Sequence, residues 1–443
     1  MTVPTLDRIR NCLEGIIPSF MATCDDDGLP NASEISQVQY IDSGHVALSY
    51  QFFNKTRRNV LATRKASVIV VDPDTNAQYR LDLDYLETRE TGPVFEAMRA
   101  KLAGIASYFG MQGVFKLLGA DIYRVRSITP LQSVLIPDPA VRNPLSSARR
   151  VTQELALATD LGDLFDRLLD ALDTHLGIHH AMVLIADGTD GRLFTVASRG
   201  YPTSGIGSEI APWQGVIGVA ANEGVPIRIG HLAGEYSYSA AIRDSAERQG
   251  LHWAAASIPY PGLAAPLSQI ALPIRPLGKT IGVLFAEALE PNRFGYDDED
   301  GLALVTGDLG LRILMVQQDD RPVAPPAVQR RRVAAGDAVV RVRHYPHDNS
   351  VFLDQAYLIK GVAGAIFWRL VSVYHAEGRT EFSNRELRLD KALRLPDYID
   401  NLEARLLLLQ RRLSERGACI QICKAGRGRF RLATDATLQL EEA

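Results

Sequence analysis

The chain has 443 residues, of which 46% are hydrophobic and 23% are charged, and its formal net charge is -4. These are ordinary globular values, and at roughly 100–200 residues per domain the length predicts about three domains. The balanced charge excludes a chain-wide basic surface for nucleic acid or membrane, so any such surface must be local.

Hydropathy and cysteine usage both indicate a cytoplasmic protein. The N-terminus lacks the apolar core of a leader, and no later stretch reaches the ~18 apolar residues of a spanning helix, so we expect no membrane contact. Four cysteines in 443 residues do not make a disulfide framework. Cys419 and Cys423 lie in a predicted strand about 13 Å apart, beyond the roughly 7 Å limit for a disulfide. We expect packed thiols, with a redox or cluster role as the alternative.

Residues 1–130 predict a small β-barrel. After a short helix at 6–13, Asp27-Gly28 supplies the positive φ of a hairpin turn between strands at 17–24 and 30–40. Further strands are predicted at 45–48, 67–72, 78–88 and 120–127, with helices from 59 and at 92–109. Many short strands separated by turn signals favour a closed or nearly closed barrel.

A basic turn follows the strand at 45–48 and leads into a helix. Its sequence is SYQFFNKTRRN, from Ser49 to Asn59. Asn54 and Thr56 can bond freed backbone groups, and Lys55, Arg57 and Arg58 bring positive charge. A helix N-terminus with cationic side chains is an anion site, most naturally a phosphate site. The alternative is a solvated basic turn.

This segment resembles the FMN-binding split barrel of the pyridoxamine 5'-phosphate oxidase-like family. The resemblance rests on the strand–turn–strand start, HVALSYQFFNKTRRN, VIVVDP and YRLDLDY. It implies FMN bound at the interface of a homodimer. Lys55, Thr56 and Arg57 would hold the phosphate beside Asn54, and Ser49, Tyr50 and Gln51 would lie near the ring system.

Two departures weaken an enzymatic interpretation. The Trp- and Arg-containing C-terminal segment of the oxidases does not follow Pro130, and no residue sits in a recognisable acid/base constellation. We therefore predict no catalytic residue. FMN could be a reporter or a structural ligand, or the pocket could be empty.

A Pro-rich linker at 131–145 precedes a second predicted domain at 146–317. Leucines line one face of a helix at 161–176, which Asp160 is expected to cap. Hairpins are predicted at 181–198 and 269–286, and a closing helix at 294–316.

This order resembles a GAF domain, through WQGVIGVAANEGVPIRIG, ALPIRPLGKTIGVLFAE and RFGYDDEDGLALV. The resemblance implies an α/β/α sensor that encloses an unknown small molecule and dimerises through its flanking helices. The alternative is that the leucine face packs on its own sheet. Aromatic residues fall where the family's pocket walls lie and could stack on a flat ligand, although each alone is more often core: Trp213, Tyr236, Tyr238, His252 and Trp253. We predict no metal ligands.

A second linker at 318–336 precedes a third predicted domain at 337–443. Short strands are followed by a helix at 361–374, a helix capped by Ser383 with Glu386 at the capping-box distance, and a long third helix at 397–416. A hairpin at 419–432 has a Gly-rich basic tip.

This segment resembles the winged-helix domain of OmpR/PhoB-type response regulators, which implies that the third helix enters the DNA major groove. The basic residues expected to meet phosphates or base edges lie on the third helix and the wing: Arg405, Arg411, Arg412, Arg416, Lys424, Arg427 and Arg429. Asp397, Asp400 and Glu403 would face the DNA backbone with like charge. Docking on a protein is therefore the alternative.

The predicted fold class is multidomain α+β: a split β-barrel, then a GAF α/β/α sandwich, then a winged helix. The predicted function is a cytoplasmic ligand- or redox-responsive sensor-regulator whose upstream domains control DNA binding. One alternative is an FMN-dependent oxidoreductase with regulatory GAF and winged-helix modules. Another is a binding scaffold without cofactor.

Overall fold

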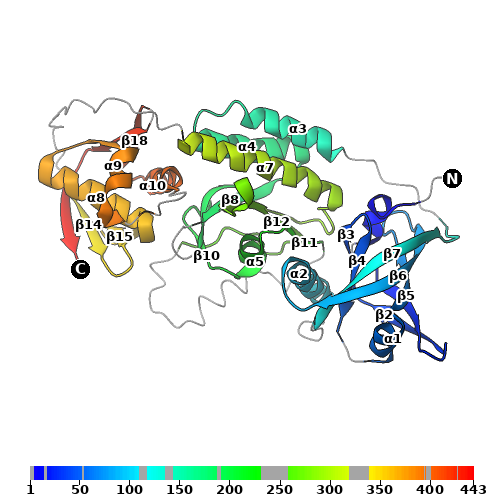
Figure 1. Cartoon of the computed structure of the whole chain (residues 1–443). Helices are drawn as coiled ribbons and strands as arrows, with labels where there is room; N and C mark the ends of the chain where they lie inside the picture. Colours follow the sequence, from blue (N-terminus) through cyan, green and yellow to red (C-terminus); the bar gives the residue numbers. More distant parts are fainter. Residues whose placement is uncertain are drawn as a thin grey trace.

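The structure is a computed structural model that describes residues 4–13, 17–51, 54–108, 117–134, 143–186, 191–230, 258–318, 339–393, 395, 401–426 and 428–443. Figure 1 shows three parts that follow one another along the chain: an N-terminal barrel, a central α/β domain and a C-terminal domain. No helix in the described ranges is both long enough and apolar enough to cross a membrane.

The N-terminal part is a single antiparallel sheet of seven strands in the order β2-β1-β5-β6-β7-β4-β3. Its strands are β1 (Ser19–Cys24), β2 (Pro30–Ile35), β3 (Val38–Asp42), β4 (His45–Tyr50), β5 (Lys65–Val71), β6 (Gln78–Arg89) and β7 (Gly119–Pro130). Its helical segments are η1 (Leu6–Leu13), α1 (Lys55–Thr63) and α2 (Pro93–Tyr108). Alternate side chains of β5 and β6 point into one core, as their polar–apolar alternation requires.

The predicted single strand at 30–40 is wrong, because it is two strands. β2 pairs with β1 at one edge of the sheet, whereas β3 pairs with β4 at the other edge. The chain breaks at Ser36 and Gln37 to cross between the edges, which brings the sheet round toward closure. Two register shifts between β6 and β7 bend the same sheet.

The central domain places a six-stranded antiparallel sheet between two helical layers. The sheet order is β10-β9-β8-β13-β12-β11. Its strands are β8 (His180–Ala186), β9 (Leu193–Arg199), β10 (Glu209–Ile210), β11 (Ile227–Ile229), β12 (Ser268–Ile274) and β13 (Gly282–Ala288). Its helical segments are α3 (Pro144–Leu155), α4 (Leu161–Leu176), α5 (Gly215–Glu223), η3 (Pro276–Gly278) and α7 (Tyr296–Gln318).

The predicted leucine face of α4 packs inside its own domain. Leu164, Leu168 and Leu172 are buried against the sheet in a core shared with α3 and α7. Asp160 caps α4 as predicted, because its side chain accepts the backbone N–H of Asp163. Helix α3 was not predicted and begins inside the expected linker, where Asn143 caps it and Pro144 takes its first position.

The described residues of the C-terminal domain form two small sheets and three α-helices around one core. The sheet β16-β15-β14-β20 consists of β14 (Val339–Tyr345), β15 (Ser350–Leu353), β16 (Ala356–Ile359) and β20 (Thr437–Glu442). The sheet β17-β19-β18 consists of β17 (Glu381–Ser383), β18 (Ile420–Gly426) and β19 (Arg429–Thr434). The helical segments are α8 (Gly361–Glu377), α9 (Asn384–Leu389), η4 (Lys391–Leu393) and α10 (Leu402–Glu415).

Two details of this domain differ from the sequence expectation. Helix α10 begins at Leu402, and residues 397–400, which the prediction included in it, lie outside the described residues. Strand β20 was missed, and it pairs in parallel with β14. Cys419 and Cys423 are free thiols as expected, and so are Cys12 and Cys24.

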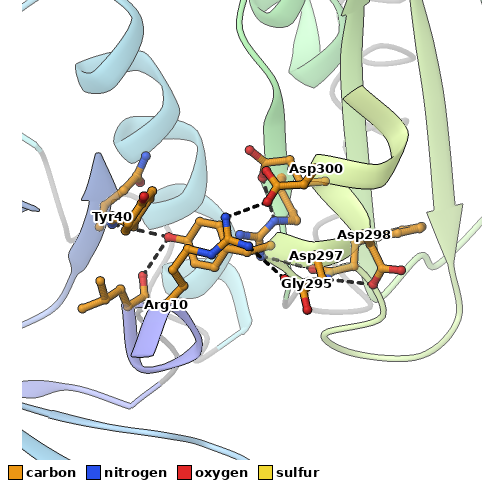
Figure 2. A network of polar contacts seen from close by, with 12 residues as sticks. Arg10, Tyr40, Gly295, Asp297, Asp298 and Asp300 are labelled. Atoms are coloured by element: carbon orange, nitrogen blue, oxygen red, sulfur yellow. Dashed lines mark hydrogen bonds and ion pairs between the residues drawn. The ribbon is translucent and has the colours of Figure 1, made fainter. Parts of the chain in front are cut away.

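Two junctions join the three parts. Figure 2 shows the first, where Arg10 of the barrel pairs with Asp297 and Asp300 at the start of α7, at 2.9 and 2.7 Å. Helix α2 of the barrel packs against α5 and β11 beside it. At the second junction, α10 of the C-terminal domain packs against α4 and β9.

Candidate functional site

The N-terminus of α1 forms where the sequence predicts an anion site. Asn54 is extended, and its side-chain oxygen accepts the backbone N–H of Arg57, so α1 begins at Lys55. Arg64 ends the helix in a left-handed conformation. The first turn therefore presents backbone N–H groups and Lys55 at the end of β4.

A small cavity of about 70 Å³ lies between this turn and strands β1, β4 and β7. Six of the seven predicted cofactor residues line it: Ser49, Tyr50, Gln51, Asn54, Thr56 and Arg57. Asp121, Tyr123 and Glu34 are among the other residues of its wall. This volume holds a few water molecules, so a single chain does not enclose a flavin ring here.

Arg57 does not point into solvent as a free phosphate ligand. Its guanidinium pairs with Asp121 at 2.5 Å and donates to the Thr88 hydroxyl at 2.7 Å. Only 10% of the Arg57 side chain and 7% of the Asp121 side chain are exposed. The Tyr50 ring lies 4.4 Å from the guanidinium carbon. In the single chain the charge of Arg57 is therefore neutralised inside the barrel, and its role in holding a phosphate stays a prediction.

Burial raises the pKa of the Asp121 carboxyl, and the hydrogen bond from Thr88 and the charge of Arg57 act in the opposite direction. The two groups form a buried unit with Thr88, whose hydroxyl also donates to Asp121 at 2.6 Å. This unit fixes the wall of the cavity.

Thr56 and Lys55 differ in what their side chains contact. The Thr56 hydroxyl is buried, accepts from Asn31 at 2.8 Å and donates to Ser33 at 3.0 Å, so it ties α1 to β2. Lys55 is half-buried and does not line the cavity. Lys55 and the backbone of the first turn are thus the groups best placed to meet an anion from outside.

Five aromatic residues were predicted to line a ligand pocket in the central domain. Tyr236, Tyr238, His252 and Trp253 lie outside the described residues. Trp213 is 50% exposed and has a positive φ of 64° just before α5. Trp213 is therefore half exposed among the described residues, and its place in a ligand pocket stays a prediction.

A buried acid that the sequence analysis missed lies in the same domain. Glu287 on β13 accepts from the backbone N–H of Leu263 at 2.6 Å and from the Gln269 amide at 3.0 Å. Burial raises its pKa, and these hydrogen bonds oppose the shift. Burial, followed by the nearby charge of Glu287, raises the pKa of Tyr201 and Tyr260 well above the usual value. The signal was a lone Glu in the apolar run of β13.

The basic residues predicted to meet DNA are engaged within the chain. Arg411 donates to the Val196 carbonyl at 2.9 Å and to Asp166 at 2.7 Å. Lys424 pairs with Asp160 at 2.9 Å. These three carboxylate and carbonyl partners belong to the central domain.

The remaining arginines of α10 face their own domain or the junction. Arg412 donates to the Leu358 carbonyl and pairs with Glu415, and Arg416 donates to the Tyr357 carbonyl. Arg405 is buried. Arg429 on β19 lines the groove between the domains, and Arg427 lies outside the described residues. In this arrangement α10 does not present a free row of arginines.

Comparison with known proteins identifies two of the three domains. Residues 158–313 match the family model of the GAF domain. The central domain is a GAF domain. Residues 5–113 match the family model described as pyridoxamine 5'-phosphate oxidase. Both predicted resemblances are thereby confirmed at the level of the domain, and the winged-helix prediction for 337–443 stays a prediction.

Solved structures resemble these two domains at low identity. The GAF domain of an Acinetobacter phosphoenolpyruvate-protein phosphotransferase is 19% identical, with a TM-score of 0.32 over 41% of this chain and 99% of that chain. An FMN-binding protein from Syntrophomonas wolfei subsp. wolfei is 16% identical, with a TM-score of 0.25 over 29% of this chain and 86% of that chain. Free methionine-R-sulfoxide reductase from Neisseria meningitidis is 17% identical, with a TM-score of 0.31 over 40% and 95%. A comparison with curated proteins finds no match.

In the described part of the chain, no group of three His, Cys, Asp or Glu residues could hold a metal ion.

Proposed function

We propose that this protein is a ligand- or redox-responsive sensor-regulator, in which an FMN-binding barrel and a GAF domain control DNA binding by a C-terminal winged helix. The proposal rests on the combination of these domain types in one chain. Two domains of ligand-binding types precede a domain of three α-helices and a basic hairpin. The flavin site that would sense redox state is thus separate from the surface that would bind DNA.

The topology of the C-terminal domain supports the winged-helix part of the proposal. Helices α8, α9 and α10 precede the β18–β19 hairpin, and β17 between α8 and α9 adds a third strand to it. The hairpin carries Lys424 and Arg429, which suits a wing that contacts phosphates. Helix α10 would be the recognition helix.

The residues at the start of α1 fit the phosphate of FMN only in part. Lys55 and the N–H groups of the first turn would hold the phosphate, because the helix dipole and the ammonium both favour an anion. Arg57 would instead position Tyr50 through its contact with the ring. When bound, FMN would supply electron-transfer chemistry beside the cavity.

A homodimer would supply what the single chain lacks at this site. The cavity of about 70 Å³ is too small for a flavin ring, so a second copy would have to cover the ring. Helix α7 offers a surface for the association of two copies, because Leu304 and Leu311 are exposed on one of its faces, next to Met315 at the groove to the C-terminal domain.

Flavin binding tests the first half of the proposal. We expect the purified protein to be yellow and to release FMN on denaturation. Changing Lys55 to Met should raise the Kd for FMN roughly tenfold, because one charged hydrogen bond to a phosphate is lost. The exposed Lys65→Met change on β5 is the matched control and should leave Kd unchanged. A colourless protein that gains no flavin fluorescence quenching on titration with FMN would contradict this half.

DNA binding tests the second half. The full chain, titrated against fluorescently labelled duplex DNA, should bind with an affinity that falls as salt rises. Arg429→Ala should reduce the salt dependence by about one counterion. If duplex DNA is bound neither by the wild-type chain nor by a variant in which α10 no longer packs against the GAF domain, the third domain acts on a protein instead.

A further inference from the structure

Helix α10 has one face in the core of its own domain and an outward face that points away from that core. Leu402, Leu409 and Leu413 are buried in the core of the C-terminal domain. The opposite face, with Leu407, Gln410, Arg411 and Ser414, lines a groove of about 1140 Å³ between this domain and the GAF domain. Figure 1 shows α10 on the side of its domain that faces α4 and α7. A recognition helix would present this same outward face to DNA.

Carboxylates of the GAF domain meet the cations of this face. Asp166 on α4 accepts from Arg411 at 2.7 Å, and Asp160 at the start of α4 accepts from Lys424 at 2.9 Å. Lys424 belongs to the proposed wing and Arg411 to the proposed recognition helix, and both are among the residues predicted to meet DNA phosphates or base edges. Carboxylate oxygens and phosphate oxygens accept the same charged hydrogen bonds, so each partner excludes the other.

Apolar packing also joins the two domains. Ala404 of α10 belongs to the hydrophobic core of the GAF domain, and Leu407 packs against that core. In the opposite direction, Ile206 of the GAF domain belongs to the core of the C-terminal domain. The Asn401 amide donates to the Ala186 carbonyl at 2.7 Å. The two domains therefore share an apolar interface and a hydrogen bond, in addition to the two ion pairs.

We infer that the GAF domain holds α10 and the hairpin in a DNA-masked arrangement, in which Asp160 and Asp166 take the places of DNA phosphates. This inference rests on the proposed function, because it names how that DNA site is regulated. DNA and α4 compete for Arg411 and Lys424, so DNA binding requires α10 to leave the GAF domain. A GAF ligand that favours the released arrangement activates DNA binding by the difference in its two affinities.

Two substitutions on the GAF side open the interface and leave the DNA-contacting residues intact. Asp166→Arg places like charges opposite each other, and because 66% of the Asp166 side chain is exposed we expect the fold to tolerate the change. Gly162→Leu drives a side chain toward Leu407, because even a Cβ atom at Gly162 would lie 3.3 Å from its Cδ1. The matched control is Asp170→Arg, on the same helix, whose partner Arg199 belongs to the GAF domain itself.

The experiment measures opening and DNA binding separately in the full chain. Hydrogen exchange of α10 and of the β18–β19 hairpin reports opening, and fluorescence anisotropy with a labelled mixed-sequence duplex reports DNA binding. We expect the Gly162→Leu/Asp166→Arg chain to exchange faster in these elements and to bind the duplex at least tenfold more tightly than the wild type. The Asp170→Arg chain should match the wild type in both measurements.

The outcomes separate this inference from the proposed function. Faster exchange with no DNA binding in any chain would leave the interface as described and would overturn the proposed DNA function, and the masking role with it. Equal DNA affinity in the wild-type and opened chains would overturn masking alone. Unchanged exchange in both the single Asp166→Arg chain and the double variant would show that these contacts do not hold α10.

Discussion

Arg57 and Asp121 illustrate at the residue scale how the barrel uses a charge that the sequence suggested for a ligand. The pair is buried, 64 positions apart in the sequence, and held by Thr88 and the ring of Tyr50. Removing one partner of such a pair leaves an uncompensated buried charge, which costs more free energy than replacing both partners by well-packed apolar residues.

We predict that Asp121→Asn destabilises the protein by about 3 kcal/mol, because the Arg57 guanidinium loses its counter-charge inside the barrel. Urea denaturation followed by tyrosine fluorescence measures the change. Glu87→Gln is the control, because its ion pair with Arg89 is half exposed and should change stability by less than about 0.5 kcal/mol. Equal effects of the two substitutions would mean that the Arg57–Asp121 pair carries no special stability.

Glu287 makes a second residue-scale prediction, which concerns pH. Burial raises its folded-state pKa above that of the unfolded chain, so the folded state binds more protons between the two values. The free energy of unfolding should therefore fall as pH rises from the ordinary pKa of a glutamate through the raised one.

Glu287→Gln removes this titration, so we expect the stability difference between wild type and variant to change across that pH window. The wild type should lose stability relative to the variant as pH rises, and the difference should be constant above the raised pKa. Urea denaturation at a series of pH values measures it. Parallel pH profiles of the two proteins would show that Glu287 titrates normally in the folded chain.

At the scale of the element, local signals in the sequence were the reliable ones. The Asp27-Gly28 turn joins β1 and β2, and Gly28 has the positive φ that the turn needs. Asp160 caps α4, and Ser383 caps α9 by accepting the backbone N–H of Glu386. Each of these features depends on residues within four positions of one another, so the sequence pattern contains all the information required.

Two strand assignments that sequence reasoning missed depend on how the strands pair in their sheets. The strand at 30–40 splits because its halves pair with β1 and β4 at opposite edges of the barrel. Strand β20 exists because β14, about a hundred residues earlier, accepts it in parallel. Its buried Leu438 between exposed Thr437 and Gln439 gave an alternating pattern that could have identified it.

For the candidate site, too, the local features were predictable from the sequence and the long-range partners were not. The sequence located the turn, its Asn54 cap and six residues of the cavity wall. It could not show that Asp121 neutralises Arg57 or that α4 binds Arg411, because those partners are separated by 64 and 245 positions.

Helix α7 carries a prediction at the element scale. Leu304, Leu311 and Met315 are exposed on one face, and we propose that a second copy covers them. Leu311→Arg should therefore convert the dimer to a monomer in sedimentation velocity, because a charge would be buried at the interface. Leu389→Arg on α9 is the control, since Leu389 is also exposed, at 71% against 50% for Leu311, and lies in another domain. A wild-type chain that sediments as a monomer at all concentrations would contradict this prediction.

At the scale of the whole molecule, α7 connects the two junctions between domains. Its first residue, Tyr296, contacts the barrel, where its hydroxyl donates to the Leu13 carbonyl and its ring centroid lies 5.4 Å from the Arg10 guanidinium carbon. Near its other end, Gln317 donates to Asn401 beside α10. A helix of 23 residues spans about 34 Å, so one rigid element touches both the flavin-type barrel and the C-terminal domain.

The DNA affinity of the full chain, measured with bound FMN oxidised and then chemically reduced without oxygen, tests whether the barrel controls the C-terminal domain. We predict at least a fivefold difference between the two states, within the usual range of coupling between sites. Arg10→Met, which removes the ion pairs to Asp297 and Asp300, should shrink that difference. Equal DNA affinity in the two states, with FMN retained throughout, would contradict the claim that the barrel controls the C-terminal domain.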